Sequence, residues 1–329
     1  MKAINIGEFG GPEVCKLDDV AAPRPQSGEA TVKVAYAGVN FIDIYMRNGT
    51  YARSHTYKTP LPMVIGMEAS GVVEAVADDV QNIRVGDRVA FCLSRGSYAE
   101  VVAVPAWKLV PVPDEVPMQV AAAFMLQGCT AHYLSRSAFP LQPGQTCLIH
   151  AGAGGVGQLL IQLAKAAGAT VFTTVSTAEK AAIAKGHGAD HCILYRDVDF
   201  QDEIRRLTSG QGVNVVYDSV GRDTIHKSIR SVRRRGLCVL FGASSGVVDS
   251  IEPLELAEAG SVFFTRPHLA DYMASNAEIC SRTDELFRLY SEKKFVLNID
   301  REFSLNDAAE AHRYLEAGKT RGKLLLRVQ

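Results

Sequence analysis

The chain has 329 residues, of which 47% are apolar and 22% are charged, with a formal net charge of −1. It is long enough for two domains, because single hydrophobic cores stop growing at about 250–300 residues. The near-neutral balance gives no reason to expect nucleic acid or an anionic membrane as the main partner.

Localisation is predicted from the cysteines and from the distribution of apolar residues. The seven cysteines are scattered without a C-x-x-C pair, which favours free thiols in a reducing cytoplasm over a disulfide framework. No run of 18 apolar residues occurs, so we expect no membrane span. The first residues, "MKAINIGEFGGPE", lack a charged and then apolar leader. We therefore expect a cytoplasmic protein.

The first 120 residues are rich in short β-like runs that Gly and Pro interrupt. The clearest runs are "EATVKVAYAGV" (29–39), "SGVVEAVA" (70–77), "DRVAF" (87–91) and "SYAEVVAV" (97–104). Several short strands with frequent turn signals are typical of an antiparallel unit. We predict a barrel-like domain here.

After about residue 125 the pattern changes to an alternation of strands and helices. Strict alternation over some 140 residues favours a parallel, doubly wound α/β sheet. The basic run "RSVRRRG" (230–236) is predicted to be a solvated helix end. The tail adds helices near 276–292 and 306–317 and a last strand "KLLLRV", which can complete either domain. The predicted strands are 146–150, 170–175, 191–195, 213–221 and 236–242, and the predicted helices are 156–167, 177–188, 198–209 and 223–234.

A glycine-rich turn joins the first predicted strand of this region to its helix. Gly152-x-Gly154-x-x-Gly157 follows "TCLIH" and precedes an apolar helix that ends at Gly168. Small residues let the backbone approach a pyrophosphate, and the helix N-terminus directs free N–H groups at it. A tight turn without a ligand is the alternative, but the neighbouring strand and helix favour a dinucleotide site.

The residue that follows the second strand bears on the choice of dinucleotide. NAD-binding units place an Asp or Glu about 20 residues on, to hold the ribose 2′-hydroxyl. Here Ser176 stands at that point, and Lys180 follows on the opening turn of the next helix. Tyr195, at the end of the third strand, is a further candidate for the same pocket. These residues favour a 2′-phosphate and therefore NADPH, although Lys180 as a merely solvated residue is the alternative.

With these residues identified, the chain resembles the medium-chain dehydrogenase/reductase superfamily. More narrowly, it resembles the zinc-free quinone oxidoreductase branch that includes zeta-crystallin. The turn "AGAGGVG" (151–157) satisfies the A-x-x-G-x-x-G form of that branch. The resemblance runs in order through nearly the whole chain, in the segments "GPEVCKL", "AGVNFIDIYMRNGTY", "GMEASGVVEAVADDVQNIRVGDRVAF", "HAGAGGVGQLLIQLAKAAGA", "VVYDSVGRDT" and "LFGASSG".

The resemblance implies a fold, a cofactor and a reaction. The implied fold is an α/β Rossmann domain (126–265) beside a GroES-like β-barrel catalytic domain (1–125), to which 266–329 returns. The implied chemistry is reduction of quinones or other α,β-unsaturated carbonyls by NADPH, in a homodimer. The implied cofactor contacts are Asn40, Thr130, Ala153, Gly154, Gly155, Val156, Gly157, Phe241, Gly242, Ser244 and Arg321.

One departure from the zinc alcohol dehydrogenases of the superfamily concerns the metal. They carry Cys where this chain has Asn40, and "GHE" where it has Gly66-Met67-Glu68. A catalytic zinc needs three protein ligands and an open position. We therefore expect no metal and, without a Lewis acid, no oxidation of simple alcohols.

Candidates for the catalytic residues lie in "GVNFIDIYMRNGTY". An Asn amide or a Tyr hydroxyl can donate to a carbonyl oxygen as negative charge grows there. The resemblance places Asn40 and Tyr45 beside the nicotinamide, and Arg266 is a third candidate for the same cleft. The alternatives are that Asn40 caps a helix beginning near Phe41 and that Tyr45 packs. His150, which closes a strand beside the glycine turn, is more typical of a structural residue.

Two other functions remain open from the sequence. An enoyl-thioester reductase is the closer alternative, and a cofactor-binding structural or RNA-associated protein of the crystallin type is the more distant one. We expect a small-molecule substrate, with no nucleic acid and no membrane partner. The apolar runs "GLCVLFG" and "SVFFTR" lie near an expected sheet edge, which natural proteins cover, and this favours a homodimer.

Overall fold

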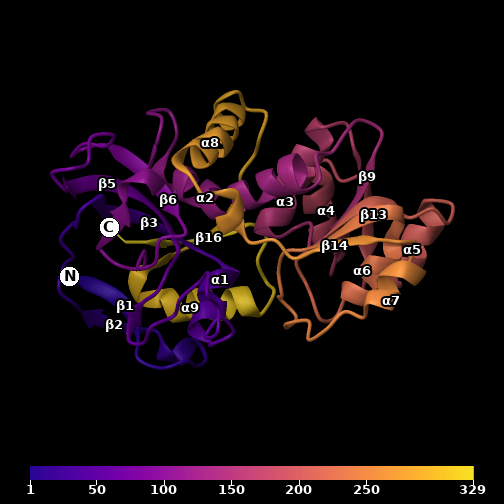
Figure 1. Ribbon diagram of the computed structural model, residues 1–329, viewed down its shortest axis with the longest axis horizontal. Helices are drawn as coiled ribbons and strands as arrows, with labels where there is room; N and C mark the ends of the chain where they lie inside the picture. The colour runs from indigo at the N-terminus through magenta and orange to yellow at the C-terminus, as the bar shows by residue number, and fades with distance from the viewer. Residues whose placement is uncertain (329) are drawn as a thin grey trace. The chain divides into compact units, whose positions relative to one another are not determined.

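The computed structural model describes residues 1–328. The chain forms two units, each built on its own β-sheets. The first unit contains residues 1–129 and the segment that begins at Met273, and the second unit is Thr130–Tyr272. Figure 1 shows each as a separate group of strands and helices. Within the described residues, no helix has both the length and the apolar character needed to cross a membrane.

The first unit is built on two sheets. The smaller sheet has the order β2-β1-β4, and the larger runs β15-β16-β3-β5-β6-β8, with β7 also pairing with β3. Every pair is antiparallel except β15 with β16. The strands are β1 (Lys2–Ile6), β2 (Lys16–Asp19), β3 (Glu29–Val39), β4 (Met63–Val64), β5 (Glu68–Val76), β6 (Arg88–Cys92), β7 (Val101–Pro105), β8 (Val110–Pro111), β15 (Ile299–Ser304) and β16 (Lys323–Arg327).

The C-terminal tail belongs to the first unit, which settles where it lies in the fold. Strand β16 pairs with β3, so that Leu325 lies opposite Gly38. The α-helices of this unit are α1 (Phe41–Arg47), α2 (Met118–Tyr133), α8 (Asn276–Ser291) and α9 (Ala308–Glu316). Helix α2 continues along the chain into the second unit as a π-helical turn, η3 (Leu134–Ala138). The short 3₁₀ turns of this unit are η1 (Pro12–Val14), η2 (Ala106–Lys108) and η5 (Leu305–Asp307), and η4 (Leu269–Tyr272) ends the second unit.

The second unit is a parallel sheet of six strands in the order β11-β10-β9-β12-β13-β14. Helices α3 and α4 cover one face, and α5 and α6 cover the other (Figure 1). This doubly wound arrangement confirms the predicted Rossmann fold. The elements are β9 (Thr146–His150), α3 (Gly155–Ala166), β10 (Thr170–Val175), α4 (Ala178–Gly186), β11 (His191–Leu194), α5 (Phe200–Leu207), β12 (Val213–Asp218), α6 (Ile225–Ser231), β13 (Val232–Leu240), α7 (Pro253–Glu258) and β14 (Phe263–Thr265).

Local signals explain the boundaries of these helices. Thr177 caps α4 by accepting the N–H of Lys180, and Asp199 caps α5 by accepting two backbone N–H groups. Gly168, with φ of +77°, follows the end of α3. Buried side chains of the strands and helices, such as Leu148 and Ile229, form the core between sheet and helices.

One prediction about an element was wrong, and one long helix was missed. Helix α6 ends at Ser231 and β13 begins at Val232, so the basic run opens a strand instead of ending a helix. Val232 is buried whereas Arg234 and Arg235 are exposed, so these arginines lie where the strand is still at the surface. Helix α2 was not predicted, because it is apolar on nearly all sides and has no helical periodicity to recognise.

Candidate functional site

The glycine turn lies between β9 and α3, as predicted. A Cβ on Gly152 would lie 2.0 Å from Thr173 Oγ1, and a Cβ on Gly157 would lie 2.3 Å from the carbonyl oxygen of Ala151. Both positions therefore need glycine, because the backbone of the turn packs against itself and against β10. This close packing is what a dinucleotide turn requires.

Hydrogen bonds within the turn set its shape. Ala151 has φ of +55°, and its carbonyl oxygen accepts the N–H of Gly154 at 2.9 Å. The N–H of Gly152 donates to the carbonyl oxygen of Thr174 at 3.2 Å. Helix α3 begins directly after Gly154, and the first N–H groups of a helix have no partner within it. The turn thus presents backbone donors suited to a pyrophosphate.

The residues predicted to bind a 2′-phosphate follow two neighbouring strands. Val175 of β10 pairs with Leu194 of β11, so Ser176 and Tyr195 leave the sheet at the same level. Tyr195 is 50% exposed, and Lys180 lies in the first turn of α4. The register therefore brings a hydroxyl, a phenol and an ammonium group to one corner of the second unit.

A second strand-end loop supplies the other predicted cofactor residues of this unit. Phe241 and Gly242 follow β13, and the N–H of Phe241 donates to the carbonyl oxygen of Asp218 at 2.8 Å. A Cβ on Gly242 would lie 2.5 Å from the carbonyl oxygen of Ser219. Ser244 is exposed and its N–H donates to the same Ser219 carbonyl at 3.2 Å. The loop is thus held against the segment that follows β12.

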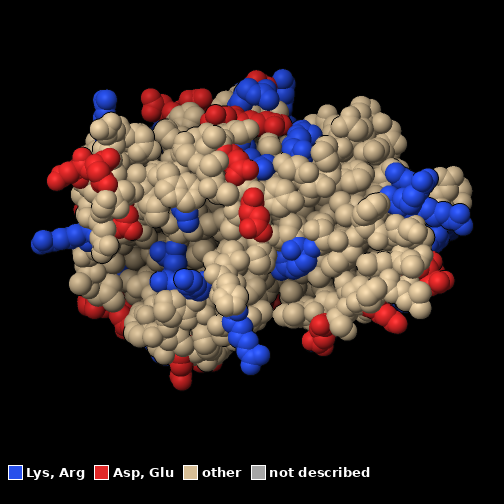
Figure 2. Space-filling view, viewed as in Figure 1, with Lys and Arg blue, Asp and Glu red and all other residues tan. Residues whose placement is uncertain are grey.

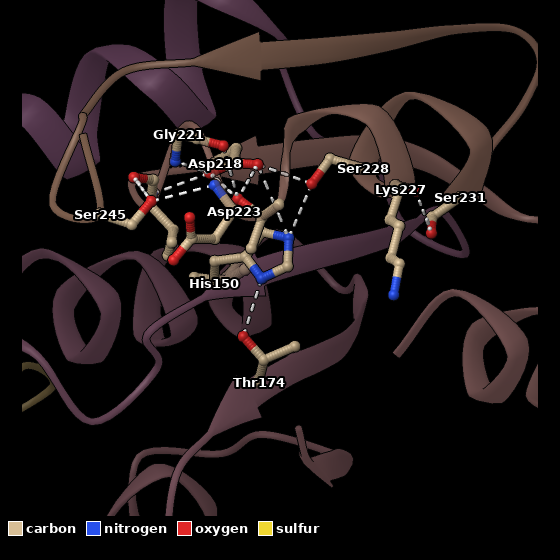
Figure 3. Close-up of polar contacts among 12 residues, drawn as sticks. His150, Thr174, Asp218, Gly221, Asp223, Lys227, Ser228, Ser231 and Ser245 are labelled. Carbon is tan, nitrogen blue, oxygen red and sulfur yellow. Dashed lines mark hydrogen bonds and ion pairs between the residues drawn. The ribbon is translucent and has the colours of Figure 1, made fainter. Parts of the chain in front are cut away.

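Behind the glycine turn lies a buried polar network that was not predicted from the sequence (Figure 3). His150 Nδ1 lies 2.8 Å from Thr174 Oγ1, and His150 Nε2 lies 2.9 Å from Ser228 Oγ. Ser228 donates in turn to Asp218 at 2.6 Å. Burial lowers the pKa of His150, while the nearby Asp218 carboxylate opposes that shift. The structural role expected for His150 is confirmed by these contacts.

The remaining predicted residues occupy three different settings. Thr130, in α2, is 7% exposed. Arg266 follows β14, is exposed, and donates from Nη1 to the carbonyl oxygen of Pro267 at 3.0 Å. Arg321 is exposed just before β16, and its backbone N–H donates to Asp300 at 3.0 Å. Their assignment as site residues stays a prediction.

In the first unit, Asn40 is 2% exposed and its amide is engaged on both sides. Its Nδ2 donates to Glu68 Oε2 at 2.7 Å, and its Oδ1 accepts from Lys323 Nζ at 2.7 Å. Lys323 also contacts Glu68 directly, and both side chains are fully buried. An ammonium only donates and a carboxylate only accepts, so these partners fix the amide orientation.

This orientation limits what Asn40 can offer a ligand. Its Nδ2 also lies 3.4 Å from the Gly38 carbonyl oxygen, which its second amide hydrogen faces. The only hydrogen-bonding group of the side chain left for a ligand is then a lone pair on Oδ1. A donor role therefore requires one of these bonds to break. The expectation that Asn40 precedes a helix is confirmed, since it is the N-cap residue of α1 and its N–H donates to Asp43 at 2.8 Å.

Tyr45 lies on α1 in a row of aromatic rings. Its centroid is 5.9 Å from that of Phe41 and 5.4 Å from that of Tyr51, which stacks on Tyr57 at 5.2 Å. Tyr45 is partly exposed, whereas Tyr57 is only 7% exposed. Packing and a donor role for the hydroxyl are therefore compatible at Tyr45.

A second buried network in the first unit ties α1 to α9. Arg47 lies 3.0 Å from His312 Nδ1 and also forms an ion pair with Glu316 at 2.6 Å. Tyr98 Oη lies 3.2 Å from His312 Nε2 and donates to Asp43 at 3.0 Å. Burial raises the pKa of Asp43 to about 7, and burial together with the Arg47 charge lowers the pKa of His312 to about 3.

The donor set around Asn40 does not fit a metal ion. Asn40 Oδ1 already receives the Lys323 ammonium, whose charge repels a cation, and the neighbouring Met67 is 4% exposed. Among residues 1–328, no cluster of three or more His, Cys, Asp or Glu side chains has the arrangement of a metal site. No metal-dependent step is derived for this protein.

Comparisons with known proteins now identify the family. Residues 26–114 match the alcohol dehydrogenase GroES-like domain, and residues 155–281 match the zinc-binding dehydrogenase domain. The chain is 40% identical over 326 residues to a quinone oxidoreductase of Pseudomonas aeruginosa, covering 99% of each chain. The chain belongs to the quinone oxidoreductase branch of the medium-chain dehydrogenase/reductase superfamily. The predicted family is thereby confirmed.

Two further relatives extend the comparison. The solved structure of the Escherichia coli quinone oxidoreductase, complexed with NADPH, is 38% identical, covers 100% of both chains and has a TM-score of 0.96. A 2-haloacrylate reductase of a Burkholderia species is 39% identical over 98% of this chain and 97% of its own. The high TM-score also confirms the predicted combination of a GroES-like and a Rossmann domain.

Proposed function

We propose that the protein is a reductase that transfers a hydride from NADPH to quinones and other α,β-unsaturated carbonyls. The choice of NADPH rests on one corner of the second unit. There Ser176, Lys180 and Tyr195 follow the paired strands β10 and β11, and no carboxylate stands at the end of β10. The NADPH complex of the E. coli quinone oxidoreductase supports this choice. The substrate class follows from membership of the quinone oxidoreductase branch.

The residues of the second unit fit this cofactor. NADPH supplies the hydride when it is bound. The backbone N–H groups of Ala153, Gly155, Val156 and Gly157 would hold the pyrophosphate, as the close approaches at Gly152 and Gly157 permit. Gly154 would line the same turn, because its own N–H is used by the carbonyl oxygen of Ala151. Ser176, Lys180 and Tyr195 would hold the 2′-phosphate. Further contacts are proposed at Thr130, Phe241, Gly242, Ser244 and Arg321.

The residues of the first unit would serve the carbonyl. We assign Tyr45 as the donor to the oxygen on which negative charge develops. Asn40, with its amide fixed by Glu68 and Lys323, would accept a cofactor hydroxyl on its remaining lone pair. Arg266 is a second candidate donor to the substrate. The proposed catalytic domain is 1–125 with 266–329, and the proposed cofactor domain is 126–265.

The oligomeric state is proposed from the exposed edge of the parallel sheet. Strand β14 ends the parallel sheet, and Phe263 on this strand is 65% exposed, while Leu254 on α7 is 59% exposed. We infer that a second copy of the chain covers this edge in a homodimer. Light scattering at micromolar concentration should then give twice the monomer mass, and a monomer mass would contradict the proposal.

The proposed partners and location follow from charge and cysteine usage. On the face shown in Figure 2, Lys and Arg and Asp and Glu form small groups among uncharged side chains. We propose a cytoplasmic protein with a small-molecule substrate, and without nucleic-acid or membrane partners. Among residues 1–328 the cysteines are all free thiols, as a reducing compartment requires.

One screen separates the candidate functions. NADPH oxidation would be measured against a quinone, an enone and an enoyl thioester, before and after prolonged chelation. We expect turnover with the quinone and the enone that survives chelation. Preferred turnover of the thioester would favour the enoyl-thioester reductase, and NADPH binding without any turnover would favour the crystallin-like structural role.

A further inference from the structure

In the buried network behind the glycine turn, the donor and the acceptor of each hydrogen bond can be assigned from the chemistry of the groups. Asp218 is a pure acceptor here, since four donor groups converge on its carboxylate: Val220 N, Gly221 N, Thr224 Oγ1 and Ser228 Oγ. Ser228 therefore uses its hydrogen toward Asp218 and offers only its lone pairs to His150. The proton of the His150 ring must then be on Nε2.

The other side of the ring completes a single chain of hydrogen bonds. Burial lowers the pKa of His150, which keeps the ring neutral, so Nδ1 is an acceptor. Thr174 accordingly donates its hydroxyl to Nδ1. The chain runs from Thr174 through His150 and Ser228 to Asp218, each member donating to the next (Figure 3). All four side chains are at most 3% exposed.

The two ends of this chain hold two different loops at the carboxyl edge of the sheet. At one end, the carbonyl oxygen of Thr174 accepts the N–H of Gly152, and His150 directly precedes Ala151 with its φ of +55°. At the other end, Asp218 accepts the N–H groups of Val220 and Gly221. The chain therefore connects the glycine turn to the loop after β12.

The loop after β12 in turn supports the loop after β13. The N–H of Ser245 donates to the carbonyl oxygen of Val220 at 2.9 Å, and the N–H of Arg222 donates to that of Gly246 at 3.2 Å. Ligands of open α/β sheets bind outside the carboxyl ends of the strands. Both loops that the chain of hydrogen bonds connects lie at this edge.

We propose that His150 and Ser228 are positioning residues for the pyrophosphate of NADPH. They act through the hydrogen-bonded chain, which sets the conformation of the glycine turn relative to the loops after β12 and β13. This inference rests on the proposed function only in its choice of NADPH as the ligand. Neither residue is assigned a contact with the cofactor, because both side chains are buried.

The experiment compares two serines of the same helix. Ser228 and Ser231 lie on α6, both are fully buried, and each donates one hydrogen bond. Ser231 donates to the carbonyl oxygen of Lys227 within the helix and takes no part in the chain from Thr174 to Asp218. Ser231→Ala is therefore a matched control for Ser228→Ala, which leaves the Nε2–H of His150 without its acceptor.

Binding of NADPH and of adenosine 2′-monophosphate would be measured by calorimetry for both variants. The second ligand has the 2′-phosphate and lacks the pyrophosphate. We expect Ser228→Ala to raise the Kd for NADPH about tenfold, because the glycine turn is then no longer held in its binding conformation. We expect unchanged affinity for adenosine 2′-monophosphate, and less than a twofold change in Ser231→Ala for both ligands.

His150 variants keep the proposal testable if Ser228→Ala does not fold. A Gln side chain can place a donor near the position of Nε2, whereas an Asn side chain reaches only the position of Nδ1. We expect His150→Gln to retain more NADPH affinity than His150→Asn. Equal NADPH affinity in Ser228→Ala and Ser231→Ala, or equal losses for the two ligands, would overturn the inference. Failure of the wild type to bind NADPH would instead overturn the proposed function.

Discussion

The two units hold their functional segments with different kinds of buried polar groups. In the second unit, neutral side chains of Thr174, His150 and Ser228 lead to the carboxylate of Asp218, behind the glycine turn. In the first unit, the buried ion pair of Lys323 and Glu68 orients the side chain at position 40.

This difference has consequences for stability and for pH. Removing Ser228 from the hydrogen-bonded chain breaks two bonds, but Asp218 keeps its donors from Val220, Gly221 and Thr224, so no charge is left unpaired and the net cost is modest. A buried ion pair that loses one partner leaves an uncompensated charge, which is strongly destabilising. We therefore expect substitutions in the first unit to act on folding and substitutions in the second unit to act on cofactor binding.

The largest effect is expected for Lys323→Met. The substitution leaves the Glu68 carboxylate buried without its cation, and the free energy of unfolding should fall by about 3–5 kcal/mol. Urea denaturation would measure the loss. Lys33→Met, at an exposed position of β3, is the control and should change stability little.

A second substitution shows whether the charge is the cause. Adding Glu68→Gln to Lys323→Met removes the unpaired charge, so it should recover part of the lost stability. Two results would contradict this account: a double variant less stable than Lys323→Met, or a Lys323→Met variant as stable as Lys33→Met. Either would mean that an unpaired Glu68 carboxylate does not destabilise the first unit.

The next effect concerns the pH dependence of stability, where Asp43 and His312 act in opposite directions. Burial raises the pKa of Asp43 from 3.8 to about 7, so its stabilising contribution is present at low pH and is lost as the pH rises through that range. Burial lowers the pKa of His312 from 6.5 to about 3, so its contribution is lost as the pH falls. Between about pH 4 and pH 6.5 the two contributions oppose each other.

Single variants should reveal each contribution separately. Relative to wild type, the stability of Asp43→Asn should increase with pH between about pH 4 and pH 6.5, because the variant lacks the Asp43 contribution, which decreases with pH in the wild type. Relative to wild type, the stability of His312→Gln should decrease with pH over the same range. Denaturant titrations at several pH values would test this, and parallel profiles for the two variants would contradict it.

Sequence reasoning predicted the second unit better than the first, for a physical reason. The glycine turn, Ser176, Lys180 and the alternation of strands and helices are local features that a short window contains. The contact of Lys323 with Asn40 joins residues 283 positions apart, and nothing near Lys323 in "KLLLRV" indicates that its ammonium is buried.

The same distinction explains the elements that were missed or misplaced. Helix α2 carries apolar residues on nearly every side, which removes the periodicity on which helix prediction depends. The strand β13 begins within a basic run, where composition favours a solvated helix end over a strand. His150 was expected to be structural, but its partners Ser228 and Asp218 lie on later elements that only the fold brings together.

A smaller effect, on binding alone, is expected at Lys180 in the second unit. If its ammonium holds the 2′-phosphate, Lys180→Ala should weaken NADPH binding about tenfold, as the loss of one charge-assisted hydrogen bond implies. NADH lacks this phosphate, so its affinity should not change. Lys185→Ala, on the exposed last turn of the same helix, should alter neither affinity. Equal losses for NADPH and NADH in calorimetry would exclude the assignment.

The last effect is expected at Tyr45, where a donor role and a packing role are separable. Tyr45→Phe keeps the ring contacts with Phe41 and Tyr51 and removes only the hydroxyl. Losing an oxyanion donor can lower kcat by about 10²–10³. A quinone accepts electrons readily, so we expect a loss below this range for the enone and a smaller one for the quinone. NADPH affinity should barely change.

Tyr45→Leu removes the ring as well, so a packing role predicts a loss of rate in Tyr45→Leu and wild-type rates for both substrates in Tyr45→Phe. Steady-state kinetics of the two variants would therefore decide whether Tyr45 supplies the hydrogen bond or whether water does.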